Sequence, residues 1–223
     1  MRNYQQIYTD ILCENSSDLR RIGIFPGAFK PPHVGHFETA LSACKNNDIV
    51  YIIVSTKSRA ISSSNVSKDT KIELKKPTSC DDGDRYKSFF NSDKYTNNIL
   101  SVKPAPCARM TSASDLRAAM AIKDKNTVIN NLPDGVDSNR ILDILMMSSD
   151  VSNPNFGYVT FEQSFEIWNI YKELLITRSG LKQDDIKIIK SEITPVRDTY
   201  DIVSDINNSD RAGNTVISLY VGT

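Results

Sequence analysis

The chain is poor in the residues and runs that mark several large protein classes. Its four cysteines form no Cys-x-x-Cys pair, which argues against a disulfide framework or a zinc knuckle and favours a reducing, cytoplasmic setting. Its longest purely apolar run, residues 49–54, is far shorter than the ~20 residues of a membrane helix. The first residues also lack the apolar core of a signal peptide. We therefore expect a cytoplasmic, globular protein that does not enter a membrane.

Neither sign of charge is in excess. Lysine plus arginine and aspartate plus glutamate each number 27, so no overall field favours nucleic acid or an anionic membrane as a partner. The patterns G-x-x-x-x-G-K-[ST] and G-x-G-x-x-G are both absent, which argues against P-loop kinases and dinucleotide-binding dehydrogenases. Any anion site must therefore be local, within a chain whose 223 residues suit a single domain.

Histidine is scarce as well, but both histidines lie in one stretch. Residues 23–36 read Gly-Ile-Phe-Pro-Gly-Ala-Phe-Lys-Pro-Pro-His-Val-Gly-His. The pattern predicts a strand at residues 21–25, a turn at Pro26 and Gly27, and a helix that begins near His33. Free N–H groups at a helix start can bind an anion, and two imidazoles would add donors. No third Cys or His stands nearby, so a metal site is the less favoured alternative.

The wider pattern predicts an α/β protein. Residues 49–54 are apolar at nearly every position, as expected of a parallel strand buried on both faces. Together with the preceding strand and helix they form a βαβ unit. We expect a Rossmann-like open parallel sheet with helices on both faces. Further strands are predicted at residues 99–103, 186–189 and 215–221. Further helices are predicted at residues 4–13, 86–90, 110–121, 136–147, 159–175 and 196–206.

The histidine-containing stretch resembles the signature of the HxGH nucleotidylyltransferase superfamily, G-x-F-x-P-x-H-x-G-H. The matching residues are Phe29, Pro31 or Pro32, His33, Gly35 and His36. A second motif of this family, S-[STA]-[ST]-x-x-R at a helix N-terminus, is similar to Ser-Ala-Ser-Asp-Leu-Arg at residues 112–117. The second motif alone would fit a plain serine-capped helix, so the two together make the stronger signal.

The resemblance implies transfer of a nucleoside monophosphate, AMP rather than CMP, from a nucleoside triphosphate to a phosphorylated small molecule with release of pyrophosphate. Under it, His33 and His36 would hold the triphosphate and stabilise charge at the α-phosphate. Lys30 would touch acceptor or triphosphate oxygens, and Arg117 would bind the β- and γ-phosphates. The residues assigned to nucleotide binding are Gly27, Phe29, Gly35, Ser112 and Ser114. Mg²⁺ is expected to be bound by phosphates and waters rather than by protein ligands.

The order of segments differs from that of the family. In the relatives an acidic D-D-x-x-R-Y loop and the S-x-[ST]-x-x-R helix come last, whereas here both lie in a displaced block at residues 81–147. Loops at residues 55–80 and 148–158 would join this block to the rest of a single domain, residues 1–223. Either these loops let the block dock in its usual place or the order disturbs the fold. We favour docking, because the cost of loop closure grows slowly with length.

Several charged residues keep two interpretations. Lys57 and Arg59 follow the second predicted strand, where phosphate contacts and solvated linker charges are equally plausible. Asp81 and Asp82 fit a solvated loop better than a contact with ribose or base. Arg197 could reach the acceptor or could lie exposed at a helix start.

The function as a whole also keeps an alternative. The rearranged order favours a non-catalytic nucleotide-binding or regulatory module of the same fold as the second hypothesis. A nucleic-acid-binding role is the weakest, because there is no basic excess and no aromatic-basic surface motif. The acceptor is open, with nicotinamide mononucleotide as the first to test, and so is the oligomeric state.

Overall fold

A computed structural model describes residues 19–61, 98, 101–104, 113–150, 152 and 157–220. The predicted features outside these residues are the helices at 4–13 and 86–90, Ser112, Asp81 and Asp82. In the described part of the chain, no helix is long and apolar enough to cross a membrane.

The main sheet has five strands in the order β4-β7-β1-β2-β6, and all neighbouring strands are parallel. The strands span Ser101–Pro104 (β4), Thr215–Leu219 (β7), Arg20–Gly27 (β1), Ile49–Ser55 (β2) and Ile186–Ser191 (β6). The central strand β1 and its neighbour β2 are largely buried on both faces, as their apolar sequences predict. The prediction of an α/β, Rossmann-like open parallel sheet is confirmed.

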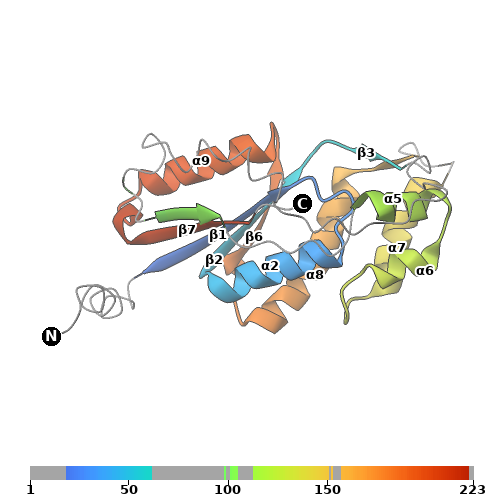
Figure 1. Ribbon diagram of the computed structural model, residues 1–223, viewed down its shortest axis with the longest axis horizontal. Helices are drawn as coiled ribbons and strands as arrows, with labels where there is room; N and C mark the ends of the chain where they lie inside the picture. Colours follow the sequence, from blue (N-terminus) through green and yellow to red (C-terminus); the bar gives the residue numbers. More distant parts are fainter. Residues whose placement is uncertain are drawn as a thin grey trace, which may run out of the picture.

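Helices cover both faces of this sheet (Figure 1). Helix α9 (Pro195–Asn207) lies on one face, and α2 (Val34–Asn46) and α8 (Phe161–Ser179) lie on the other. Each of the three begins at a residue whose side chain accepts a hydrogen bond from the first turn. These N-cap residues are His33, Thr160 and Thr194.

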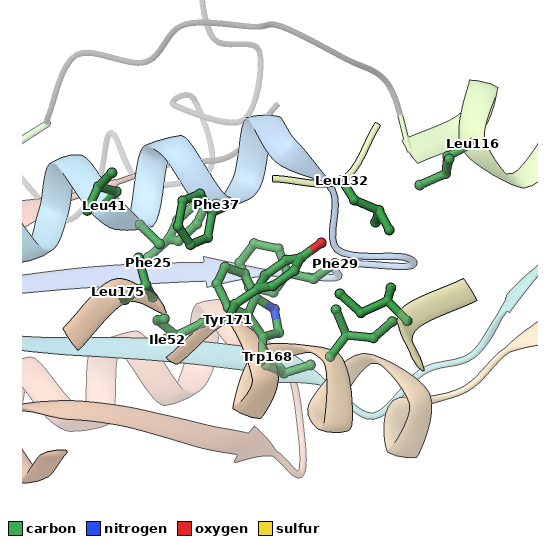
Figure 2. Close-up of a cluster of buried hydrophobic side chains, with 14 of the residues drawn as sticks. Phe25, Phe29, Phe37, Leu41, Ile52, Leu116, Leu132, Trp168, Tyr171 and Leu175 are labelled. Atoms are coloured by element: carbon green, nitrogen blue, oxygen red, sulfur yellow. The ribbon is translucent and has the colours of Figure 1, made fainter. Parts of the chain in front are cut away.

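Two apolar clusters hold the helices to the sheet. Successive strand residues point to opposite faces, so Ile24 contributes to the cluster under α9 and Phe25 to the cluster under α2 and α8. The second cluster is the larger and contains the big aromatic side chains Phe37, Trp168 and Tyr171 (Figure 2). The HxGH stretch therefore rests on the more heavily packed face.

Three shorter helices lie next to the carboxyl end of β1 (Figure 1). They are α5 (Ala113–Ala121), α6 (Lys125–Asn130) and α7 (Ser138–Met146), followed by a single 3₁₀ turn. Helix α6 was not predicted, although Asp124 caps it by accepting a hydrogen bond from the N–H of Thr127. Its six residues are too few to show a helical period in the sequence.

The two predicted junction loops meet each other. Arg59–Ala60 (β3) and Tyr158–Val159 (β5) form a small antiparallel ribbon. Three of these residues were predicted as loop, and Val159 was predicted as the start of a helix. The N–H of Ile61 also donates to the carbonyl of Gly157 at 2.7 Å. The backbone ladder overrides the polar composition that suggested loops. At the sheet edge, β4 of the displaced block pairs with β7.

Most other boundaries agree with the sequence patterns within a few residues. The capping box of Thr160 and Gln163 is present, and Pro195 is the first residue of α9, as predicted. The predicted turn at Pro26 and Gly27 is wrong, because both residues continue β1 and pair with β2. Helix α8 runs beyond the predicted end to Ser179, where Gly180 terminates it with a left-handed backbone.

Candidate functional site

The loop between β1 and α2 is held from several sides. The backbone of Phe29 is left-handed, with φ of 49°, and its ring is only 3% exposed. That ring packs edge-on against Phe25 and Trp168, with centroid distances of 4.8 and 5.1 Å (Figure 2). A Cβ on Gly27 would lie 2.6 Å from the same ring, so the loop needs glycine there. Phe29 and Gly27 thus have a packing role, and their part in nucleotide binding stays a prediction.

The two histidines form a reciprocal capping box at the start of α2. Nδ1 of His33 accepts from the N–H of Gly35 at 3.2 Å, and Nδ1 of His36 accepts from the N–H of His33 at 3.3 Å. The rings are stacked, with centroids 3.7 Å apart. Because each Nδ1 is an acceptor, the proton of each neutral ring lies on Nε2. Both imidazoles therefore carry an Nε2–H donor that the capping hydrogen bonds do not use.

The backbone at this helix start is less free than the sequence pattern predicted. The N–H of Val34 donates to the carbonyl of Asn131 at 2.8 Å, and the N–H of Gly35 is used by His33. Asn131 is the C-cap residue that follows the unpredicted helix α6. The expectation of an anion site made of free backbone N–H groups is therefore wrong for these two residues. Any anion would be bound mainly by side chains.

Burial keeps both histidines neutral. It lowers the pKa of His33 to about 4, and it lowers the pKa of His36 well below its usual value, with the neighbouring His33 as a smaller cause. Nε2 of His33 has no hydrogen-bond partner within the described residues. A buried donor without a partner costs free energy, so this atom is a candidate contact for a ligand.

Lys30 is unusual because it is a lysine that is buried. Its side chain is 1% exposed, and its Nζ lacks a hydrogen-bond partner among residues the structure describes. Nζ lies 5.4 Å from the centroid of the Phe161 ring. Burial lowers the pKa of Lys30 to about 8, while the charge of Glu162 opposes this shift. Lys30 is thus still mostly protonated at pH 7 and would be stabilised by an anion.

Arg117 comes to this loop from α5. Its Nη1 donates to the carbonyl oxygen of Lys30 at 2.5 Å, and its Nη2 donates to the Ser114 hydroxyl at 2.9 Å. Burial lowers the pKa of Arg117, and the charge of Arg59 in β3 lowers it further. The two sequence motifs therefore meet in space, and the guanidinium of Arg59 lies near enough to affect the pKa of Arg117.

The other candidate residues that the structure describes lie at exposed positions. Lys57 and Arg59 are exposed, and the backbone N–H of Lys57 donates to the Ser55 hydroxyl. Arg197 is exposed on α9, where its Nε lies 3.1 Å from a carboxylate oxygen of Asp201. This favours the solvent-facing interpretation of Arg197. No group of three His, Cys, Asp or Glu residues that could hold a metal ion occurs within the described ranges.

Phe161 and Lys190 were not predicted as site residues. Phe161 packs against the larger core cluster, and its partly buried ring has Lys30 and Lys190 over it. Lys190 lies just beyond the predicted end of its strand, because β6 continues to Ser191. A lysine immediately after an apolar strand is the signal that could have singled it out.

Comparison with known proteins adds no name to this site. No family model, curated protein or solved structure matches the chain. The functional interpretation therefore depends on the residues and their geometry.

Proposed function

We propose that the protein is a nucleotidylyltransferase that transfers AMP from ATP to a phosphorylated small molecule and releases pyrophosphate. The observation that carries this proposal is the contact of Arg117 with the carbonyl of Lys30, because it joins two motifs that are far apart in the sequence. Both motifs are expected to bind the same triphosphate. A chance resemblance would not require them to meet.

The donors around the loop suit a polyphosphate. Lys30 is a buried cation without a hydrogen-bond partner in the described part of the chain, and Arg117 brings a second positive charge. The Nε2–H groups of His33 and His36 would donate to the oxygens of the α-phosphate. Phosphoryl transfer needs chiefly positioning and charge stabilisation, and fixed donors in a buried site provide both.

In this reaction an acceptor phosphate oxygen forms a bond to the α-phosphorus while the bond from that phosphorus to the bridging oxygen breaks. Pyrophosphate leaves with the electron pair of the broken bond. Mg²⁺, bound through phosphate oxygens and waters, would neutralise part of the triphosphate charge. The protein's part is to hold the phosphates in line and to stabilise their charge with His33, His36, Lys30 and Arg117.

The test separates two roles of His33, the Nε2–H donor and the Nδ1 helix cap. An Asn side chain can still cap the helix, but it cannot reach as far as Nε2. We expect His33→Asn to keep the melting temperature near that of the wild type and to lower pyrophosphate release by about 100-fold or more. The assay uses ATP or CTP, Mg²⁺ and a panel of phosphorylated acceptors led by nicotinamide mononucleotide.

Two results would count against the enzyme. The wild type could release no pyrophosphate with any pair of substrates, or His33→Asn could remain fully active. If the wild type is inactive but ATP raises its melting temperature, the second hypothesis of a non-catalytic nucleotide-binding module is the better one, since Lys30 would bind phosphate whether or not transfer follows.

A further inference from the structure

Lys190 lies level with the end of β1, just before the loop that carries Lys30. In the strand register Gly27 of β1 is beside Val54 of β2, and Val54 is beside Lys190 of β6. The three parallel strands thus end at the same edge of the sheet. Ligands of open α/β sheets bind beyond this edge.

Two ammonium groups lie within 6 Å of the centre of one aromatic ring. Nζ of Lys190 lies 5.6 Å from the centroid of Phe161, and Nζ of Lys30 lies 5.4 Å from the same centroid. Phe161 is the first residue of α8, a helix of 19 residues, so the ring also lies at a helix N-terminus. An anion placed near this ring would be attracted by both lysines and by the helix.

The carboxylates nearby do not prevent this binding. Lys190 is half-exposed and pairs with Glu192 at 3.1 Å, and Glu162 acts on Lys30 only through its charge. An exposed ion pair contributes about 0–1 kcal/mol, so a phosphate can replace Glu192 at small cost. The buried Nζ of Lys30 has no hydrogen bond to lose among the described residues.

An ordinary role for Lys190 would be to protect the edge strand β6 from pairing with another chain. Lys187 of the same strand fits that role, because it lies over Tyr51 of the neighbouring strand, 5.2 Å from the ring centroid. Residues three apart in a strand point to opposite faces. Lys190 instead points toward α8 and the loop of Lys30.

The geometry points to a subsite in which Lys190 binds the phosphate of the acceptor beside the ring of Phe161, with Lys30 shared between this phosphate and the triphosphate. This inference rests on the proposed function and assigns the acceptor to the β6 side of the loop. Arg117, on the α5 side, would then serve the triphosphate. The ligand class is a small molecule that carries a phosphomonoester.

Calorimetric titration with two probes tests the subsite, with ribose 5-phosphate as the phosphomonoester and MgATP as the triphosphate. We expect Lys190→Ala to weaken binding of ribose 5-phosphate by about tenfold or more, because a charge-assisted contact is lost. Binding of MgATP should change by less than about twofold. Lys187→Ala, the matched control in the same strand, should change neither.

The two probes test the subsite and the proposed function separately. If the wild type does not bind ribose 5-phosphate, or if Lys190→Ala and Lys187→Ala bind it equally well, the subsite is wrong. If Lys190→Ala weakens MgATP as much as ribose 5-phosphate, Lys190 belongs to the triphosphate site and the assignment to the acceptor is overturned. Failure of the wild type to bind MgATP would instead contradict the proposed function.

Discussion

Helices α2 and α9 both follow the carboxyl end of a parallel strand, β1 and β6 respectively, and their surroundings differ. At α2, Lys30 and His33 are buried, and each has a nitrogen without a hydrogen-bond partner in the described residues. At α9, Arg197 is exposed and paired with Asp201. Within α9, the buried side-chain atom without a partner is a carboxylate oxygen of Asp198, which would repel an anion.

The comparison shows that a helix start is not by itself a functional site. Both starts have a side-chain cap and the same partial charge from the helix dipole. What distinguishes α2 is buried positive charge and donors that find no partner in the described protein. Three changes would break or sharpen this difference.

The largest effect is expected from removing the arginine near each helix start. These are Arg117, which reaches the loop before α2 from α5, and Arg197 in α9. Arg117→Ala should lower pyrophosphate release by about 100-fold or more, because a partly buried cation that is held beside the loop of Lys30 is lost. Arg197→Ala should leave the rate within about twofold, because an exposed pair contributes little. Steady-state rates for both variants would measure this, and equal losses would show that α9 also belongs to the site.

The second effect is on stability. The pKa of Lys30 falls from 10.5 to about 8 on folding, so the unfolded chain holds the proton more tightly and the charged side chain destabilises the fold below pH 8. We expect Lys30→Met to raise the free energy of unfolding at pH 7 by on the order of 2 kcal/mol while it weakens ATP binding.

Urea unfolding at two pH values provides the control. The advantage of Lys30→Met should shrink as the pH rises from 8 toward 10, because the wild-type lysine loses its proton in the folded state and its cost disappears. A variant that is less stable than the wild type at pH 7 would show that the ammonium is well paired.

The smallest effect is the pH dependence of binding. A bound triphosphate should raise the pKa of Lys30 above its free value of about 8. Affinity for ATP should therefore be level from pH 6.5 to 7.5 and fall by up to about tenfold per pH unit above 8. Lys30→Met should lose this fall, and a wild-type affinity that stays constant to pH 9.5 would contradict the assignment.

Much of the local structure could be predicted from residue patterns. The apolar run at β2 indicated a buried strand, and Thr160 with Gln163 indicated the start of α8. These features depend on side-chain alternation and on hydrogen bonds between residues a few positions apart. The short helix α6 and the ribbon of β3 and β5 were missed, because six-residue and two-residue elements show no clear period.

The sequence was sufficient to place two histidines at a strand-to-helix corner and to predict the α/β class, because short-range sterics and periodicity determine both. Only the tertiary structure showed that Asn131 occupies the N–H of Val34, that Arg117 reaches the carbonyl of Lys30, and that Lys190 shares a ring with Lys30. These contacts join residues far apart in the chain. Their geometry depends on how helices pack on the sheet, which no local pattern encodes.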